Sequence, residues 1–188
     1  MSAVTWCETR EMLDEDRRRL SDWLARDGLA FSRWHPAYLC VLLYRYSHYL
    51  HVREHKYAAR LIWHLNGLVT GADIPPPIEI GPGFLIPCPA GTAIAGKAGR
   101  NFTVLMCSGI GGELGRYEDV GAGSGLPVLG DDVFMEPRTG VLGPVRVGNR
   151  VRIKAGATVT TNVDDDVVAC APPARFFPAA HSLRMVRR

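Results

Sequence analysis

Three side chains in this sequence are candidates for covalent or acid–base chemistry: the thiol of Cys88 and the carboxylates of Glu118 and Asp119. A cysteine thiolate is a strong nucleophile when a positive neighbour lowers the pKa of the thiol. The sequence places no histidine near Cys88, and buried cysteines usually act as small apolar side chains, so packing is the favoured interpretation. Glu118 and Asp119 lie in a glycine-rich segment, where a carboxylate can act as a general base, although most exposed carboxylates are only solvated.

Histidines and cysteines do not follow a metal-binding pattern. His51 and His55 stand four residues apart, but residues 52–54 between them fall at an expected helix break. His48 and His64 neighbour aromatic residues on predicted helices, so we expect them to pack. The five cysteines are scattered without a CxxC pair, and we therefore predict free thiols, no disulfide framework and no metal.

The first third of the chain carries apolar residues at helical spacing. This pattern predicts three helices, over about 8–27, 36–51 and 54–69. The Ile-Pro-Pro-Pro cluster at 74–77 cannot continue a helix, because proline lacks the N–H donor and fixes φ. We therefore assign residues 1–72 to an α-helical N-terminal block.

Beyond this boundary, apolar residues return every sixth position. One register contains Leu129, Met135, Val141, Val147, Ile153 and Val159. A helix would need returns near 3.6 residues and an ordinary strand near 2, whereas a period of six with turn glycines is typical of short strands joined by tight turns. The pattern favours a parallel β-helix with three strands per coil over a β-sandwich with accidental spacing. The fold class is therefore α+β.

The repeat fails over residues 111–127, which we predict to be a loop that protrudes from one coil. An insertion of this length is uncommon in a compact domain unless it serves a site or an interface. The predicted β-helix then covers residues 73–170, and residues 171–188 form a basic C-terminal tail.

Composition and hydropathy exclude several classes of protein. The chain has 188 residues, of which 47% are hydrophobic and 22% charged, and this composition indicates a folded protein. Its net charge of +3 is too weak for nucleic-acid binding. The longest apolar stretch, residues 37–43, is far shorter than the roughly 20 residues of a membrane span. The N-terminus lacks the pattern of a signal peptide, so we expect a cytoplasmic location.

Five segments together resemble the serine acetyltransferases, a family of left-handed β-helix, hexapeptide-repeat acyltransferases. Residues 44–50 read YRYSHYL, similar to the family's YRxAHxL, and 73–76 read DIPP, similar to DIHP. Residues 80–91 are similar to the coil IGxGxxxDHATG, 108–112 to VTLGG, and 171–175 to GVPAR. The resemblance covers about two thirds of the chain, and it implies a left-handed parallel β-helix with acetyl-CoA as co-substrate.

Departures from the family pattern gather at the acceptor site that the resemblance implies. Cys88 stands at the position of the family's histidine base, and Pro87 at that of the preceding aspartate. The loop's return, RHPxIG in the family, begins here with Gly125 and Leu126, so only Asp73 of the acceptor-site acids remains. A serine zwitterion would lose the partners of its ammonium and carboxylate groups, and we expect a different acceptor.

The resemblance also implies a set of residues for the acyl donor. Where the family has a small-residue run such as IGAGA, this chain has MEPRT at 135–139. The thioester is expected near Gly111 and Gly112. The CoA phosphates are expected near basic residues of the later coils. The candidate donor-binding residues are Gly111, Gly112, Arg138, Lys154, Ala155, Gly156, Pro173 and Arg175.

The leading hypothesis is an acyl-CoA-dependent acyltransferase that transfers an acetyl or other acyl group to a hydroxyl of a small acceptor. Its candidate catalytic residues are Cys88, Asp73, Glu118 and Asp119. The resemblance implies a homotrimer with sites between adjacent β-helices, each covered by a neighbour's loop. Two alternatives stay open: a catalytically inactive β-helix scaffold or regulatory homologue, because the family's histidines are missing, and an N-acyltransferase, because an amine needs less help from a base.

Overall fold

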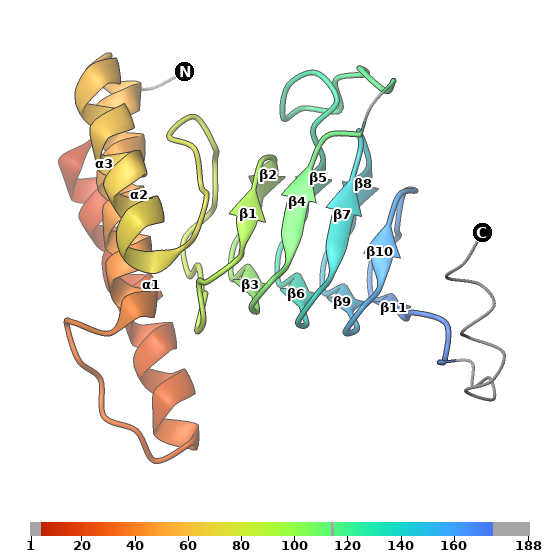
Figure 1. The fold of residues 1–188 in the computed structure, drawn as a ribbon, viewed down its shortest axis with the longest axis horizontal. Helices are drawn as coiled ribbons and strands as arrows, with labels where there is room; N and C mark the ends of the chain where they lie inside the picture. The colour runs from red at the N-terminus through yellow and green to blue at the C-terminus, as the bar shows by residue number, and fades with distance from the viewer. Residues whose placement is uncertain (1–4, 114, 175–188) are drawn as a thin grey trace, which may run out of the picture.

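The computed structural model describes residues 5–113 and 115–174, and in this part of the chain three helices stand at one end of a β-helix of eleven short strands (Figure 1). The left-handed parallel β-helix with an N-terminal helical block confirms the predicted fold. None of the described helices is both long and apolar enough to cross a membrane. The strands are β1 Ala93–Ile94, β2 Lys97–Ala98, β3 Thr103–Val104, β4 Gly109–Gly111, β5 Val128–Leu129, β6 Phe134–Met135, β7 Gly140–Leu142, β8 Arg146–Val147, β9 Arg152–Ile153, β10 Thr158–Val159 and β11 Val168–Ala169.

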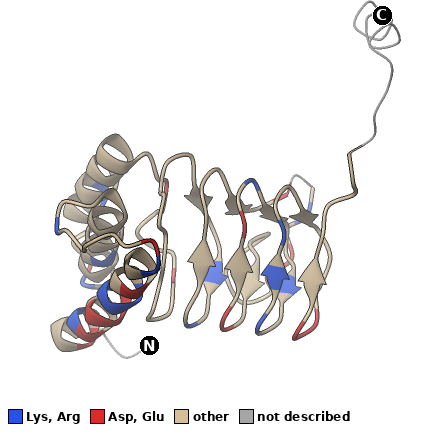
Figure 2. Ribbon diagram, turned by 90° about the horizontal axis from the view of Figure 1, so that it is seen from below, with Lys and Arg blue, Asp and Glu red and all other residues tan. Residues whose placement is uncertain are grey.

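The helices α1 (Trp6–Arg26), α2 (Pro36–Val52) and α3 (Lys56–Thr70) agree with the predicted ranges to within two residues. A capping box at Thr5 starts α1, which carries many of the acidic and basic side chains of the block (Figure 2). Helix α3 ends at Gly71, whose φ of 74° is the left-handed conformation that glycine adopts freely. The same glycine begins the first corner of the β-helix.

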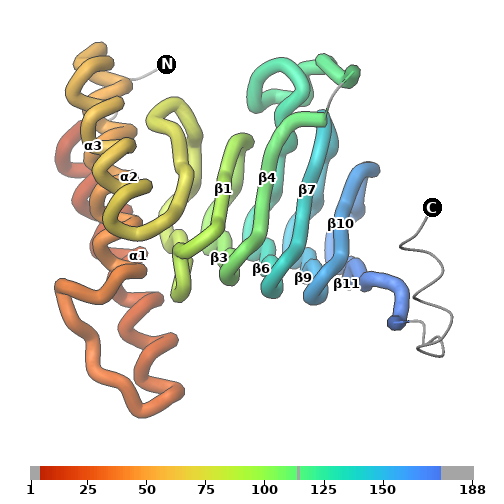
Figure 3. The backbone as a smooth tube through the Cα atoms, in the orientation of Figure 1, coloured from red at the N-terminus to blue at the C-terminus, as the bar shows by residue number. Residues whose placement is uncertain are grey.

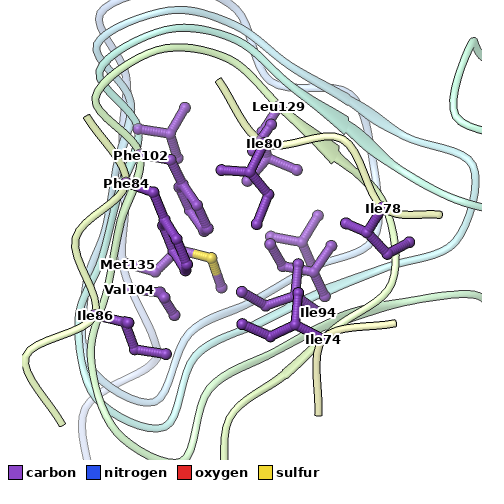
Figure 4. Packing of buried hydrophobic residues seen from close by; sticks show 14 of the residues in the cluster. Ile74, Ile78, Ile80, Phe84, Ile86, Ile94, Phe102, Val104, Leu129 and Met135 are labelled. Carbon is purple, nitrogen blue, oxygen red and sulfur yellow. The ribbon is translucent and has the colours of Figure 1, made fainter. Parts of the chain in front are cut away.

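The strands form three parallel sheets, and the coils stack side by side along the axis of the β-helix (Figure 3). Seen along this axis, each coil is triangular (Figure 4). Sheet A contains β1, β4, β7 and β10; sheet B contains β2, β5 and β8; sheet C contains β3, β6, β9 and β11. Val128 of β5 pairs with Arg146 of β8, an offset of 18 residues, so each side of the coil takes six residues. Gly109 pairs with Gly140, 31 residues later, because the coil between them carries the protruding loop.

The interior of the coil is filled by the residues of the six-residue registers (Figure 4). Phe84 and Phe102 stack in adjacent coils, with ring centroids 5.8 Å apart and planes inclined by 4°. Their neighbours Ile86, Val104 and Met135 are at most 1% exposed. Burying such side chains contributes roughly 1.5 to 3 kcal/mol each, which explains why the register is so visible in the sequence.

One corner of the coil excludes every side chain. At Gly81, Gly99, Gly130 and Gly148, which stack in successive coils, an added Cβ would lie 2.6 to 2.9 Å from backbone atoms of the next coil. Real Cβ atoms do not approach backbone this closely, so glycine is required here. The residue that follows each of the last three of these glycines takes part in side-chain to backbone hydrogen bonds between coils. Asn149 Oδ1, for example, accepts a hydrogen bond from the Asp131 N–H, one coil earlier, over 2.8 Å.

The helical block closes the open end of the β-helix through a buried ion pair. Arg45 donates from Nε to Asp16 Oδ2 over 2.8 Å and from Nη2 to Asp16 Oδ1 over 3.1 Å. The Arg45 guanidinium also donates to the carbonyls of Ile80 and Gly81, over 2.6 and 2.7 Å. Asp16 accepts the Phe84 N–H over 2.6 Å. One ion pair, only 2% exposed on each side, thus satisfies three backbone groups of the first coil.

Two further side chains of α2 bind the same coil. The Tyr44 hydroxyl donates to the Ile78 carbonyl over 2.8 Å and accepts the Ile80 N–H over 3.1 Å. Burial raises the pKa of Tyr44 to about 12, so this hydroxyl keeps its proton at neutral pH. His48 Nδ1 lies 2.9 Å from the Pro76 carbonyl oxygen, and burial lowers the pKa of His48. The Tyr-Arg-x-x-His pattern is therefore a structural cap.

We predict that Asp16→Asn lowers the free energy of unfolding by roughly 3 to 5 kcal/mol, because it leaves the Arg45 charge buried without a counter-ion. Urea unfolding followed by circular dichroism measures this. The matched control is Asp14→Asn, which breaks an exposed pair with Arg17 at 3.7 Å and should change stability by less than about 1 kcal/mol. Equal effects of the two substitutions would contradict the capping role.

We predict that Gly130→Ala destabilises the protein by about 1 to 3 kcal/mol, because the new methyl group would meet the backbone of Gly148. Gly109→Ala is the control, since its Cβ meets only the Ala93 carbonyl oxygen, at 3.9 Å. Thermal unfolding of both variants tests the prediction. A Gly130→Ala midpoint within 1 °C or so of the Gly109→Ala midpoint would show that the corner tolerates a side chain.

Candidate functional site

The outer face of sheet A carries a row of five residues in register, and the three central ones are very small. Asp73, Ala93, Gly109, Gly140 and Thr158 lie in register along five successive coils. Their side chains point outward, because the residues that follow them in each coil are buried. The three central members, which we call the small-residue row, carry at most a methyl side chain over two coil spacings of about 4.8 Å each. The backbone is most open at Gly109, whereas a Cβ on Gly140 would lie 3.3 Å from the Thr158 side chain.

Asp73 lies at the N-terminal end of this row, and its side chain is fixed. The Trp63 indole Nε1 donates to Asp73 Oδ1 over 2.8 Å. The Asp73 backbone is held in the coil ladder, since its N–H donates to the Thr92 carbonyl and its carbonyl accepts the Ile94 N–H, each over 2.8 Å. Asp73 is exposed, and its second carboxylate oxygen has no hydrogen bond or ion pair among the described residues.

Cys88 lies at the same edge of sheet A, in the turn that leads from sheet C to sheet A. The two neighbouring coils meet there, because the Gly91 N–H donates to the Gly71 carbonyl over 3.0 Å. The Cys88 thiol is half-buried, and no described residue donates a hydrogen bond to its sulfur. A nucleophilic role for Cys88 therefore stays a prediction without a positive partner in the described part of the chain.

The loop at 111–127 lies at the opposite edge of sheet A, because it follows β4 and leads into sheet B (Figure 1). Arg116 fastens its base by donating to Glu113 Oε2 over 3.2 Å and to the Thr160 carbonyl over 3.0 Å. Within one chain, the strands of sheet A separate this loop from Asp73 and Cys88. The four candidate catalytic residues thus fall into two groups.

The two carboxylates of the loop differ in their contacts. Asp119 Oδ1 accepts the N–H groups of Gly121 and Gly123 over 2.7 and 3.1 Å. These hydrogen bonds hold the pKa of the Asp119 carboxyl below its ordinary value. Asp119 therefore shapes the turn, whereas the side chain of Glu118 is exposed and its backbone carbonyl accepts the Gly125 N–H over 2.8 Å.

The candidate donor-binding residues are also divided between the two edges. Gly111 and Gly112 lie where β4 enters the loop, and a Cβ on Gly111 would meet nothing within 4 Å. The remaining described candidates lie in turns between sheets C and A or on the segment after β11. These are Arg138, Lys154, Ala155, Gly156 and Pro173. Arg175 lies outside the described residues.

Glu136 occupies the turn beside these donor candidates. It lies 2.9 Å from Arg152 Nε and 3.0 Å from Lys154 Nζ, and its other oxygen accepts the Ala155 N–H over 3.1 Å. Partial burial opposes ionisation of Glu136, but the hydrogen bonds from Lys154, Arg152 and the Ala155 amide hold its pKa below the ordinary value. Lys154 and the Ala155 amide thus already have an anionic partner.

Two residues that shape this region escaped the sequence analysis. Trp63 was considered only as one of the aromatic residues beside the histidines, and its one sequence signal is its place on the last helix, ten residues before Asp73. Glu136 was treated as a departure from a small-residue run, and its partners lie one coil later, at an offset of 16 to 18 residues. The described residues contain no group of three His, Cys, Asp or Glu that could hold a metal ion.

The helical cap, the three-sided coil and the single protruding loop define a β-helix protein of the hexapeptide-repeat class. No family model matches the sequence. The chain is 30% identical over 159 residues to serine acetyltransferases of Synechococcus elongatus and Helicobacter pylori strain J99. These matches cover 82% and 81% of this chain and 62% and 90% of the relatives, so the chain spans less than two thirds of the first.

Solved structures show the same fold. Serine acetyltransferase isoform 3 of Entamoeba histolytica superposes with a TM-score of 0.77 at 22% identity, over 97% of this chain and 65% of that one. The Neisseria gonorrhoeae serine acetyltransferase gives 0.77 at 23%, over 93% and 69%. With the 30% identity to the Helicobacter pylori enzyme over 90% of its length, the chain belongs to the serine acetyltransferase family.

We predict that Asp119→Ala speeds amide hydrogen exchange at Gly121 and Gly123 by roughly two- to tenfold, because both N–H groups lose their acceptor. Asp119→Asn keeps an oxygen at the same place and should leave the exchange close to that of the wild type. Exchange measured by mass spectrometry or NMR distinguishes the two variants. Exchange in Asp119→Asn as fast as in Asp119→Ala would contradict the turn-shaping role.

Proposed function

We propose that this protein is an acyl-CoA-dependent acyltransferase that transfers an acetyl or other acyl group to a hydroxyl of a small acceptor. Membership of the serine acetyltransferase family supports this reaction class. A related solved structure, with a TM-score of 0.74 at 19% identity, is a serine acetyltransferase in complex with CoA. The observation that carries the proposal is the small-residue row of sheet A, which leads to the Asp73 carboxylate.

The residues of this face fit an acyl-CoA. A Cβ on Gly109 or Gly111 would meet no atom closer than 3.9 Å, so an extended pantetheine arm has room against the backbone there. Arg138 and Lys154 would hold the phosphates, with Lys154 turning from Glu136. The bound thioester supplies an activated acyl carbon, and the protein's own groups must orient the acceptor and receive its proton.

The acceptor is a small molecule other than free serine bound in the family's manner. Cys88 and Leu126 offer neither a charge nor a strong hydrogen bond to the ammonium or carboxylate of a zwitterion. Asp73 is the remaining acid at this edge of sheet A. An amine acceptor is the second candidate, because an exposed carboxylate without an ion-pair partner among the described residues suits an ammonium group.

A homotrimer would complete the site. One chain keeps its loop and its Asp73 at opposite edges of sheet A, and a neighbouring copy can bring its loop to this Asp73. Arg116, which ties the loop base to Thr160 over 3.0 Å, would keep the loop in place for that contact.

All five cysteines are free thiols, as a reducing compartment favours, which supports a cytoplasmic location.

Calorimetric titration of the purified protein with CoA and acetyl-CoA tests the proposal. We predict saturable binding at one site per subunit. Gly111→Phe should abolish binding without unfolding the protein, because its side chain enters the open space beside the row. Ala25→Phe, on the exposed surface of α1, adds the same bulk elsewhere and should leave binding unchanged.

Failure of a folded protein to bind acetyl-CoA up to millimolar concentration would overturn the proposal. The inactive scaffold would then be the better description. Equal binding of acetyl-CoA by Gly111→Phe and the wild type would instead show that the donor does not bind beside the small-residue row. Thiol release with hydroxyl and amine acceptors, measured on the binding-competent protein, distinguishes the two acceptor classes.

A further inference from the structure

Asp73 is an exposed carboxylate held in one position. Surface aspartates usually sample several rotamers, and fixing one requires a specific contact. Here the Trp63 indole N–H binds Asp73 Oδ1 over 2.8 Å, while both backbone groups of Asp73 are engaged in the coil ladder. The second carboxylate oxygen remains available at the head of the small-residue row.

Trp63 is held by a rigid element. It lies on α3, whose last turn is fixed because the Thr70 hydroxyl donates to the Asn66 carbonyl over 2.8 Å. Asn66 is fully buried, and its amide donates to the Cys40 carbonyl of α2 over 3.1 Å. The indole is further covered by His64, with ring centroids 4.7 Å apart. The donor that fixes Asp73 is therefore itself positioned by packed helices.

An indole N–H is an unusual partner for a functional carboxylate, and it has a chemical consequence. It donates a hydrogen bond but carries no charge and cannot accept a proton. Trp63 therefore orients Asp73 but leaves its negative charge in place. An arginine or lysine at this position would neutralise that charge. No ion pair joins Asp73 to any other described residue, so its negative charge remains available to an acceptor.

The other candidate bases are less suitable. Asp119 uses one oxygen to accept two backbone N–H groups of its own turn. Glu118 has an exposed side chain without a contact that orients it among the described residues. Cys88 lacks a donor to its sulfur in the described part of the chain. Among these candidates, Asp73 alone combines a fixed carboxylate, a free oxygen and a place at the end of the small-residue row.

We propose that Asp73 is the general base of the acyl transfer and that Trp63 is the positioning residue that aims it. This inference rests on the proposed function. The acceptor's proton passes to the free oxygen of Asp73 while the acceptor's oxygen or nitrogen forms a bond to the thioester carbonyl carbon. As the tetrahedral intermediate collapses, the carbon–sulfur bond breaks, and the departing CoA thiolate takes the proton from Asp73. The carboxylate is thereby restored, and the products are the acylated acceptor and CoA thiol.

The first experiment tests turnover with defined probes. Thiol release from acetyl-CoA is followed with L-serine, L-serinamide and ethanolamine as acceptors. Asp73→Asn should lower kcat by 10²- to 10⁴-fold, as expected for loss of a general base, with unchanged affinity for acetyl-CoA. Trp63→Phe should lower kcat by roughly 10- to 100-fold through misplacement of the carboxylate, with the KM for acetyl-CoA unchanged.

The matched control is Trp23→Phe. Trp23 is also a half-buried helical indole, but it packs against Phe134, with ring centroids 6.2 Å apart, and should leave kcat unchanged. Trp63→His restores a ring N–H donor and should recover part of the activity that Trp63→Phe loses. A merely structural role of Trp63 would instead give equal losses in the histidine and phenylalanine variants.

The second experiment tests the contact without any acceptor. In a ¹H–¹⁵N spectrum, the indole N–H of Trp63 should move when Asp73→Asn removes the charged acceptor, while the Trp23 signal stays in place. If the wild type fails to bind acetyl-CoA, the proposed function itself is wrong. If it binds acetyl-CoA but releases thiol no faster than Asp73→Asn with every probe, or if the Trp63 signal does not move, the proposed base is wrong.

Discussion

The buried pair of Asp16 and Arg45 is the interaction on which the rest of this structure depends. The first coil of a β-helix has no coil stacked on its outer side, so its backbone groups need partners from elsewhere. Arg45 binds two carbonyls of that coil and Asp16 binds one N–H, with both side chains 2% exposed. Because every later coil pairs with the one before it, the register of the whole β-helix starts from this contact.

The stacking of each coil on the one before it carries that register along the chain. At one corner the glycine column excludes side chains, and at the next position Asn and Asp oxygens bind the backbone one coil earlier. The same stacking aligns Ala93, Gly109 and Gly140, which are 16 and 31 residues apart in the sequence, into the small-residue row. The candidate site is therefore a direct product of the stacking geometry, with Asp73 at one end and the loop at the far edge.

The sequence alone predicted the fold well, because the period of six is written in residues that must be buried. Leu129, Met135 and Ile153 are each at most 2% exposed, as their register required. The helical spacing of apolar residues also predicted the three helices to within two residues at each end. These features depend on neighbours in sequence or on a fixed repeat, which pattern analysis can detect.

The contacts of the site depend on side chains brought together by packing, and the sequence pattern could not supply them. The Trp63 to Asp73 hydrogen bond requires the angle at which α3 enters the first coil. The grouping of Glu136 with Arg152 and Lys154 requires the stacking of two coils. The loop carboxylates and Cys88 were considered together in the sequence, yet one chain separates them across sheet A.

The most direct test of the central claim is a crystal structure of the protein with bound CoA. We predict that the pantetheine arm lies along Ala93, Gly109 and Gly140, and that its thiol points toward Asp73 of one chain, beneath the loop of a neighbouring copy. A CoA bound away from sheet A would contradict this placement. A thiol directed away from Asp73, with the row empty, would contradict it equally.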